Sequence, residues 1–257
     1  MTTFADRFRA LDALRTSKIE RSRFCSSLTI PSILPPEGWN EQSQLSQPYS
    51  SVAARGVTAM ASRMLSALLP LNDTPFFRFE LATGMEPETD VSNYLSNLSY
   101  QVYNKLSSGN LRETIYQLLQ HLIIIGDVLI LCDDDMNFRI IRVDRFVVRR
   151  DVYGDPEEII YKEYETLPAE SDNLDTLMSS SLDMDSRNGY RPIYTRLTKN
   201  EDGEWVSITQ DKEGDVINSG TLTVPNFVLL RWSGIPGENY GRSHCEDLIG
   251  DIKALEG

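Results

Sequence analysis

The sequence has little of the material from which most enzymes and secreted proteins are built. Only two histidines, His121 and His244, and three cysteines occur among its 257 residues. The cysteines are odd in number and far apart, so they predict no disulfide framework and indicate a reducing compartment. The apolar run at residues 122–125 is cut by Gly126-Asp127 and is too short to span a membrane. The N-terminus also lacks the apolar segment of a secretion signal.

Motifs of phosphate binding and hydrolysis are missing as well. The chain has no GxxxxGK[ST] or GxGxxG loop, no HExxH pair and no GxSxG turn. His121 sits beside the apolar face of an expected helix, which favours a structural role, and His244-Cys245 has no further ligands at zinc spacing. We therefore expect a soluble intracellular protein that is not an enzyme, with no catalytic residue, no cofactor and no bound metal.

Acidic residues far outnumber basic ones in the second half of the chain. The net charge is −13, and residues 133–257 hold 14 basic and 26 acidic side chains, whereas residues 1–132 hold 11 and 12. Residues 165–189 are rich in Ser and Asp, have a net charge of −5, and predict an acidic, mobile surface insertion. Such a surface repels nucleic acid and disfavours tight sequence-reading DNA binding. It remains compatible with a surface past which DNA slides.

The first half has the periodicity of amphipathic helices. Asn110 followed by Glu113 predicts a capping box at the start of the last of them, and Pro70 ends an earlier one. Residues 76–82 alternate in the manner of a strand. The four expected helices cover residues 4–24, 57–68, 91–106 and 111–123.

From residue 127 the apolar period changes to two, which is typical of strands joined by Asp-, Asn- and Gly-rich turns. A loop at 233–240 then leads to a final helix, for which Ser243 is the expected N-cap. The helix stops in mid-pattern at the last residues, and we expect more chain to follow. The fold class is therefore α+β, N-terminal amphipathic helices with a mainly antiparallel sheet, in three regions: 1–126, 127–232 and 233–257. The expected strands are 128–132, 138–143, 146–150, 159–164, 190–198, 204–210 and 226–232.

Two charged clusters each have two interpretations. Asp127, Asp133 and Asp135 would share one face of a strand, as the carboxylates of a metal-dependent nucleic-acid enzyme do. We favour a strand start and a hairpin turn, because no phosphate-binding lysine cluster accompanies them. Six basic residues near the N-terminus, with a local net charge of +3, are either a solvated helix face or a surface that contacts DNA or an acidic partner. They are Arg7, Arg9, Arg15, Lys18, Arg21 and Arg23.

Five segments, in order along the chain, resemble the portal (head-to-tail connector) proteins of short-tailed bacteriophages of the podovirus type that encode an autonomous, single-subunit RNA polymerase. No single segment is specific, but five in the right order make a specific match that extends across nearly the whole chain and leaves out residues 165–225. The segments are 29–35, 54–70, 124–129, 147–154 and 240–256.

The resemblance implies a ring, in this family a dodecamer, at one capsid vertex, through which double-stranded DNA is packaged and ejected without sequence specificity. It implies docking of the terminase and of a tail adaptor, contacts with major capsid and scaffolding proteins and with internal core proteins, and assembly in the host cytoplasm before residence in the virion. This chain would form the wing and the approach to the stem, with the second stem helix, clip and crown beyond Gly257.

A ring needs subunit interfaces, and four residues are candidates for an interface or structural role. We expect Arg242 either to bridge to a carboxylate of the neighbouring subunit or to form an ion pair within its own chain. Tyr240, Arg149 and Arg150 lie in the resembling segments and join Arg242 as candidates. The alternative functions are a carboxylate metal-dependent nucleic-acid enzyme and another virion structural protein such as a tail adaptor.

Overall fold

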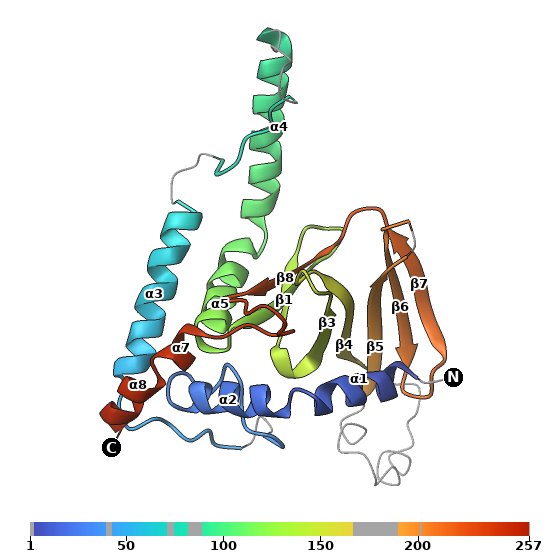
Figure 1. The fold of residues 1–257 in the computed structure, drawn as a ribbon. Helices are drawn as coiled ribbons and strands as arrows, with labels where there is room; N and C mark the ends of the chain where they lie inside the picture. The colour runs from blue at the N-terminus through green and yellow to red at the C-terminus, as the bar shows by residue number, and fades with distance from the viewer. Residues whose placement is uncertain are drawn as a thin grey trace, which may run out of the picture. The chain divides into compact units, whose positions relative to one another are not determined.

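The computed structural model describes residues 3–39, 43–70, 75–81, 89–166, 190–200 and 202–256 (Figure 1). Helices come first and two sheets follow, which confirms the α+β class. The chain forms two compact units: unit 1 is Met1–Arg21, Ile141–Asn226 and Ser233–Gly241, and unit 2 is Ser22–Ile140, Phe227–Trp232 and Arg242–Gly257. The units group the chain by packing. The division into consecutive regions at residues 126 and 232 stays a prediction.

Unit 1 is built on a five-stranded antiparallel sheet in which each strand pairs with its neighbours in the sequence. Its strands, in spatial order, are β3 (Phe146–Arg150), β4 (Pro156–Thr166), β5 (Tyr190–Lys199), β6 (Trp205–Asp211) and β7 (Val216–Leu222). Four of these match expected strands. Strand β7 was missed because it is exposed almost throughout and holds Ser219 and Gly220, so it has no buried face and low strand propensity. Most of the expected acidic insertion, 167–189, lies outside the described residues.

Helix α1 (Phe4–Ala13) covers this sheet. Phe4, Ala5 and Phe8 are buried in one cluster with sheet residues such as Ile160 and Tyr194 (Figure 1). The single helix expected over 4–24 is wrong, because the chain turns after Ala13 and a second helix, α2 (Thr16–Ser27), leads from unit 1 into unit 2. The turn leaves Leu14 85% exposed, so Leu14 does not extend the buried apolar side of α1 that Phe4 and Phe8 form.

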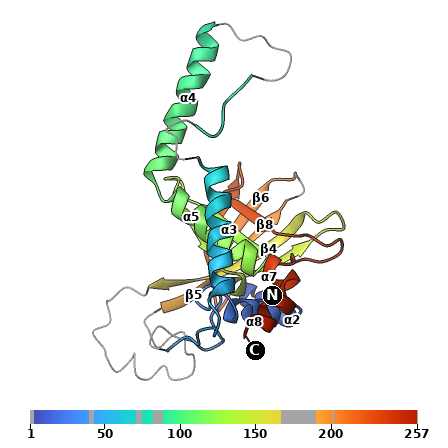
Figure 2. The same ribbon diagram turned by 90° about the vertical axis from the view of Figure 1, so that its left-hand side faces the viewer.

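The helices of unit 2 are α3 (Val52–Leu68), α4 (Thr89–Ser108) and α5 (Leu111–Ile124), all confirming expected helices. Helices α3 and α5 lie side by side, whereas α4 extends beyond them (Figure 2). The strand expected over 76–82 is wrong for residues 76–81, which the structure describes without a strand, and residue 82 lies outside the described residues. Their alternating aromatic rings instead contact one another and α4, with Phe76 against Tyr103 at 6.2 Å.

The expected capping box at α5 is also wrong. Asn110 stands at the N-cap position but makes no side-chain cap. Its Nδ2 donates to the Phe138 carbonyl at 2.6 Å, and its Oδ1 accepts from the Phe138 backbone N–H at 3.0 Å. Two hydrogen bonds to strand β2 (Phe138–Ile141) thus replace one bond within the helix, and they fix the first residue of that strand.

Unit 2 also contains the three-stranded sheet, in the order β2 (Phe138–Ile141), β1 (Asp127–Cys132), β8 (Phe227–Arg231). Strand β1 is central and almost wholly buried, and it pairs antiparallel with β8. The 3-10 turn η1 (Val143–Arg145) precedes β3, and the final segment forms α7 (His244–Asp247) and α8 (Ile249–Glu256). No helix among the described residues is long and apolar enough to cross a membrane.

Candidate functional site

Three of the resembling segments make contacts that the structure shows, two of them with each other in unit 2 and one within unit 1. In unit 2, Gly126 lies where α5 passes into β1, with a φ of +92° that favours glycine. A Cβ atom on Gly126 would lie 2.7 Å from the backbone carbon of Arg242 and 2.8 Å from the backbone nitrogen of Ser243. The Gly126 carbonyl also accepts from the Trp232 N–H at 2.8 Å. The segments 124–129 and 240–256 therefore meet, and glycine is required at their contact.

Ser243 begins helix α7 as expected. Its Oγ accepts a hydrogen bond from the Glu246 backbone N–H at 3.0 Å, which confirms the N-cap. Arg242, beside it, donates from Nη1 to Glu246 Oε1 at 2.8 Å, an i,i+4 ion pair on a partly exposed surface. The intrachain alternative for Arg242 thus has a partner in this structure. The bridge to a neighbouring subunit stays a prediction.

In unit 1, the residues just before Gly241 cover the edge of the five-stranded sheet at β3. The Tyr240 hydroxyl accepts from the Val148 N–H at 3.1 Å, and Asn239 Oδ1 accepts from the Arg150 N–H at 2.8 Å. The Arg150 side chain completes the attachment by donating to the carbonyls of Asn239 and Gly154. Backbone N–H groups of an edge strand are thereby paired, which blocks the edge to other strands. Tyr240 and Arg150 thus have hydrogen-bond partners within the chain, and a place for either in a subunit interface stays a prediction.

Two of the six N-terminal basic residues are buried in unit 1. Arg15 is 3% exposed, donates to the Val143 carbonyl at 2.6 Å and places its guanidinium 5.3 Å from the Tyr240 ring centre. Lys18 is 6% exposed and donates to the Gly241 carbonyl at 2.6 Å. Charged donors to backbone carbonyls in buried positions fix the loop that holds Tyr240.

The other four basic residues lie at the surface with partners nearby. Arg9 pairs with Asp6, Arg23 pairs with Glu37, and Arg21 donates to the Ser17 hydroxyl. Arg7 reaches a glutamate of the sheet, described next. The structure therefore does not gather the six into one basic patch. Contact of any of them with DNA or a partner stays a prediction.

A buried glutamate with three arginines is a feature that the sequence did not indicate. Glu158 on β4 is 1% exposed, accepts from Arg7 at 2.9 Å and Arg196 at 2.7 Å, and lies 3.8 Å from Arg149. Burial alone raises the pKa of Glu158, but the hydrogen bond from Arg7 and the charges of Arg196, Arg7 and Arg149 outweigh it, so this pKa lies below its usual range. Arg149 also pairs with Glu157 at 3.1 Å. The cluster links α1 to the sheet. Its members come from four separate segments, so no local spacing could have shown it.

The three carboxylates of the metal-site alternative do not converge. Asp127 is buried at the start of β1, whereas Asp133 follows its end, a separation of six strand residues or about 20 Å. Asp133 Oδ1 accepts from the Asn137 N–H at 2.7 Å, which confirms a turn, and this bond, with that from the Asn137 side chain, lowers the pKa of Asp133. Within the described residues, no three Asp, Glu, His or Cys side chains form a metal-binding group.

The histidines have structural surroundings. His121 is buried on α5 and its Nδ1 lies 2.8 Å from the Gln117 carbonyl, while the ring of His244 lies 5.7 Å from that of Trp232. The burial of His121 and its contact with the Gln117 carbonyl agree with the structural role expected for it.

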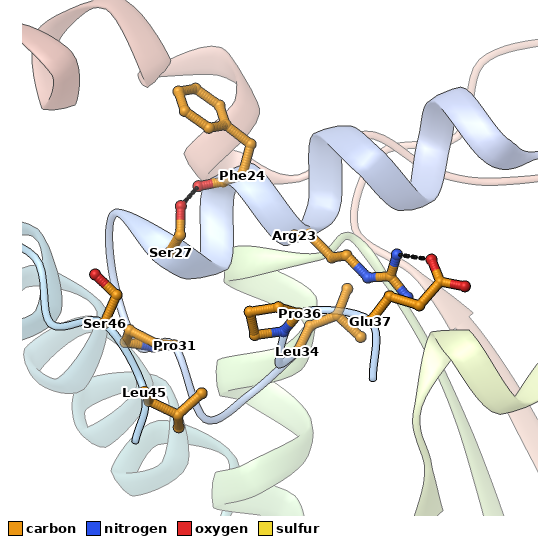
Figure 3. Close-up of a pocket in the computed structure, with 9 residues that line it drawn as sticks. All are labelled: Arg23, Phe24, Ser27, Pro31, Leu34, Pro36, Glu37, Leu45 and Ser46. Carbon is orange, nitrogen blue, oxygen red and sulfur yellow. Dashed lines mark hydrogen bonds and ion pairs between the residues drawn. The ribbon is translucent and has the colours of Figure 1, made fainter. Parts of the chain in front are cut away.

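A pocket in unit 2 lies between the end of α2 and the turn that follows it (Figure 3). Its lining is mostly apolar, and the charged side chains at its edge, Arg23 and Glu37, are joined at 3.0 Å. The nine lining residues include one carboxylate, Glu37, which is held by its ion pair with Arg23. They are Arg23, Phe24, Ser27, Pro31, Leu34, Pro36, Glu37, Leu45 and Ser46.

Comparison with known proteins gives one consistent result. The family model described as bacteriophage head to tail connecting protein matches residues 1–257. The portal protein of Enterobacteria phage T3 is 26% identical over 251 residues, covering 92% of this chain and 47% of the phage T3 protein. That of Escherichia phage T7 is 24% identical, with coverage of 92% and 47%. That of Pseudomonas phage phiKMV is 23% identical, with coverage of 95% and 51%. The chain thus spans about half the length of the curated relatives it matches.

Proposed function

Because this chain belongs to the family of bacteriophage head to tail connecting proteins, we propose that it is the wing-forming part of a portal subunit. The subunits form a ring at one capsid vertex, and double-stranded DNA passes through the ring during packaging and ejection. The observation that carries the proposal is the family match across the whole chain, together with three portal proteins at 23–26% identity. The role is structural and involves no catalysis.

The physical chemistry of the chain supports a conduit. Affinity for DNA comes mainly from Lys and Arg side chains that neutralise phosphates. Residues 133–257 have 26 acidic against 14 basic side chains, so this part of the chain repels the phosphate backbone. Weak contact with DNA is a requirement for a ring through which the genome must slide. The same charge balance disfavours the nucleic-acid enzyme alternative.

The partners of the assembled protein follow from the same role. They are further copies of the chain in a ring, a dodecamer by resemblance, the terminase, a tail adaptor, the major capsid and scaffolding proteins, and internal core proteins. The subunits assemble in the host cytoplasm. Arg242 remains a candidate for the subunit interface. If Arg242→Ala leaves ring assembly of the full-length protein unchanged, its role is confined to the ion pair with Glu246.

A genetic experiment tests the function. A phage with its gene for this protein deleted should form heads that contain no DNA, and full-length protein supplied from a plasmid should restore packaging. DNA protected from nuclease inside purified heads is the measured quantity. Normal DNA content in heads formed without the protein would contradict a portal role.

A further inference from the structure

Helix α4 in unit 2 is exposed over most of its length. Of the 20 residues from Thr89 to Ser108, only Ser99 is buried. Tyr94 is 66% exposed and Tyr100 47% exposed. The helix extends beyond α5, with which it makes few contacts (Figure 2). In proteins most of the stability of a helix comes from tertiary packing of an apolar face, and the part of the chain that the structure describes gives α4 little of it.

The composition of α4 is not that of a solvated helix. Asp90 and Lys105 are its only charged residues, in a chain of which 25% is charged. Exposed helices of monomers have charged residues on the solvent side. Depletion of charge together with enrichment in tyrosine characterises the buried core of protein–protein interfaces. Three tyrosines stand on this helix, at positions 94, 100 and 103.

The segment 75–81 enlarges this apolar region, and its two charged residues, Arg78 and Glu80, form an ion pair with each other. The Phe79 N–H donates to the Ser99 hydroxyl of α4 at 3.1 Å, which joins the segment to the helix. Two of its phenylalanines are exposed by 39–43% although they contact other rings. We define the α4 surface as the exposed apolar side chains of these two elements. They are Phe76, Phe79, Leu81, Val91, Tyr94 and Tyr100.

We propose that the α4 surface is an interface between neighbouring copies of this chain. The inference rests on the proposed ring, which requires a heterologous contact between identical subunits. Each chain has a net charge of −13, so copies repel one another and must meet where the surface carries no net charge. The α4 surface meets this condition. Nucleic acid does not fit it, because Lys105 is the only cation on the helix and Arg78 of the segment 75–81 is paired with Glu80.

Site-specific photo-crosslinking in the full-length protein tests the proposal. A benzoyl-phenylalanine replaces Tyr94, and the matched control replaces Tyr153, which is 90% exposed in the turn after β3 in unit 1. A mixture of unlabelled and ¹⁵N-labelled chains distinguishes crosslinks between copies from those within one copy. We expect a ladder of covalent dimers and larger multimers from position 94, at least fivefold stronger than from position 153.

A charge at the same position gives a second readout. Tyr94→Glu should reduce the fraction of protein in rings at least tenfold, whereas Tyr153→Glu should leave it unchanged, with the same far-UV circular dichroism in both. If the wild-type protein forms rings, but position 94 gives no crosslink between copies and Tyr94→Glu assembles normally, the interface is wrong and the ring stands. If crosslinks from position 94 lead only to a different phage protein, the interface is likewise wrong. If wild-type chains form no ring, the proposed function itself fails.

Discussion

Gly126 gives the sharpest test of the packing around segment 239–246. The substitution Gly126→Ala adds a single methyl group at a backbone φ of +92°. The new Cβ would lie 2.7 Å from the backbone carbon of Arg242 and 2.8 Å from its carbonyl oxygen. These are backbone atoms, so no side-chain rotation relieves the clash. Either the α5–β1 turn or the start of α7 must move.

The expected cost has two parts. An alanine in a sparsely populated region of φ costs about 1–3 kcal/mol. Forcing a methyl group into filled space costs about 1–3 kcal/mol more. The lower conformational entropy of alanine in the unfolded chain offsets about 0.4–1 kcal/mol of this cost. Gly126→Ala should therefore lower the free energy of unfolding by about 1–6 kcal/mol, a large share of the typical total of about 5–15 kcal/mol.

Gly38→Ala is the matched control, because Gly38 also lies in unit 2. It has a φ of +75°, and a Cβ there would meet no atom within 4 Å. It should show the conformational cost alone, about 1–2 kcal/mol. Urea unfolding followed by circular dichroism gives both values. The reasoning is refuted if Gly126→Ala is no more destabilising than Gly38→Ala, because the close approach to Arg242 would then not exist.

Three further predictions concern single side chains. The folded-state pKa of Glu158 is depressed, so the ionised carboxylate stabilises the fold above its unfolded pKa of about 4.5, and this stabilisation is lost as pH falls through the lower folded pKa. In Glu158→Gln, the urea concentration at the unfolding midpoint should therefore fall less steeply than in the wild type between about pH 6 and 3. Burial, with a contribution from Cys25, raises the pKa of Cys245 to about 12. At about pH 8, Ellman's reagent should therefore react first with the half-exposed Cys132, and with the buried Cys25 and Cys245 only on unfolding. Equal rates at all three would contradict this. Ser243→Ala removes the α7 cap and should cost about 1 kcal/mol by urea unfolding, and no loss would contradict the cap.

Local patterns in the sequence predicted most of the fold. Helix α3 follows from Val57, Met60 and Ala61 recurring at helical spacing before Pro70, and the turn at Asp133 follows from Asp and Asn chemistry. The wrong predictions concern residues whose hydrogen-bond partner is distant in the sequence. Asn110 forms hydrogen bonds with Phe138 of β2, 28 residues away, instead of capping its own helix.

The candidate site shows the same division. The cap at Ser243 is local, and the sequence predicted it. The hydrogen bond from Lys18 to the Gly241 carbonyl spans 223 residues, and that between Tyr240 and Val148 spans 92. A basic residue near the N-terminus therefore looks like a surface charge in the sequence, and only the fold shows that it lies buried against a loop.

The measurement that tests the portal account most directly is the mass and symmetry of the full-length assembly, from native mass spectrometry with negative-stain imaging. The account predicts a closed ring of high cyclic symmetry with an axial hole. A monomer or a closed dimer at micromolar concentration would contradict it.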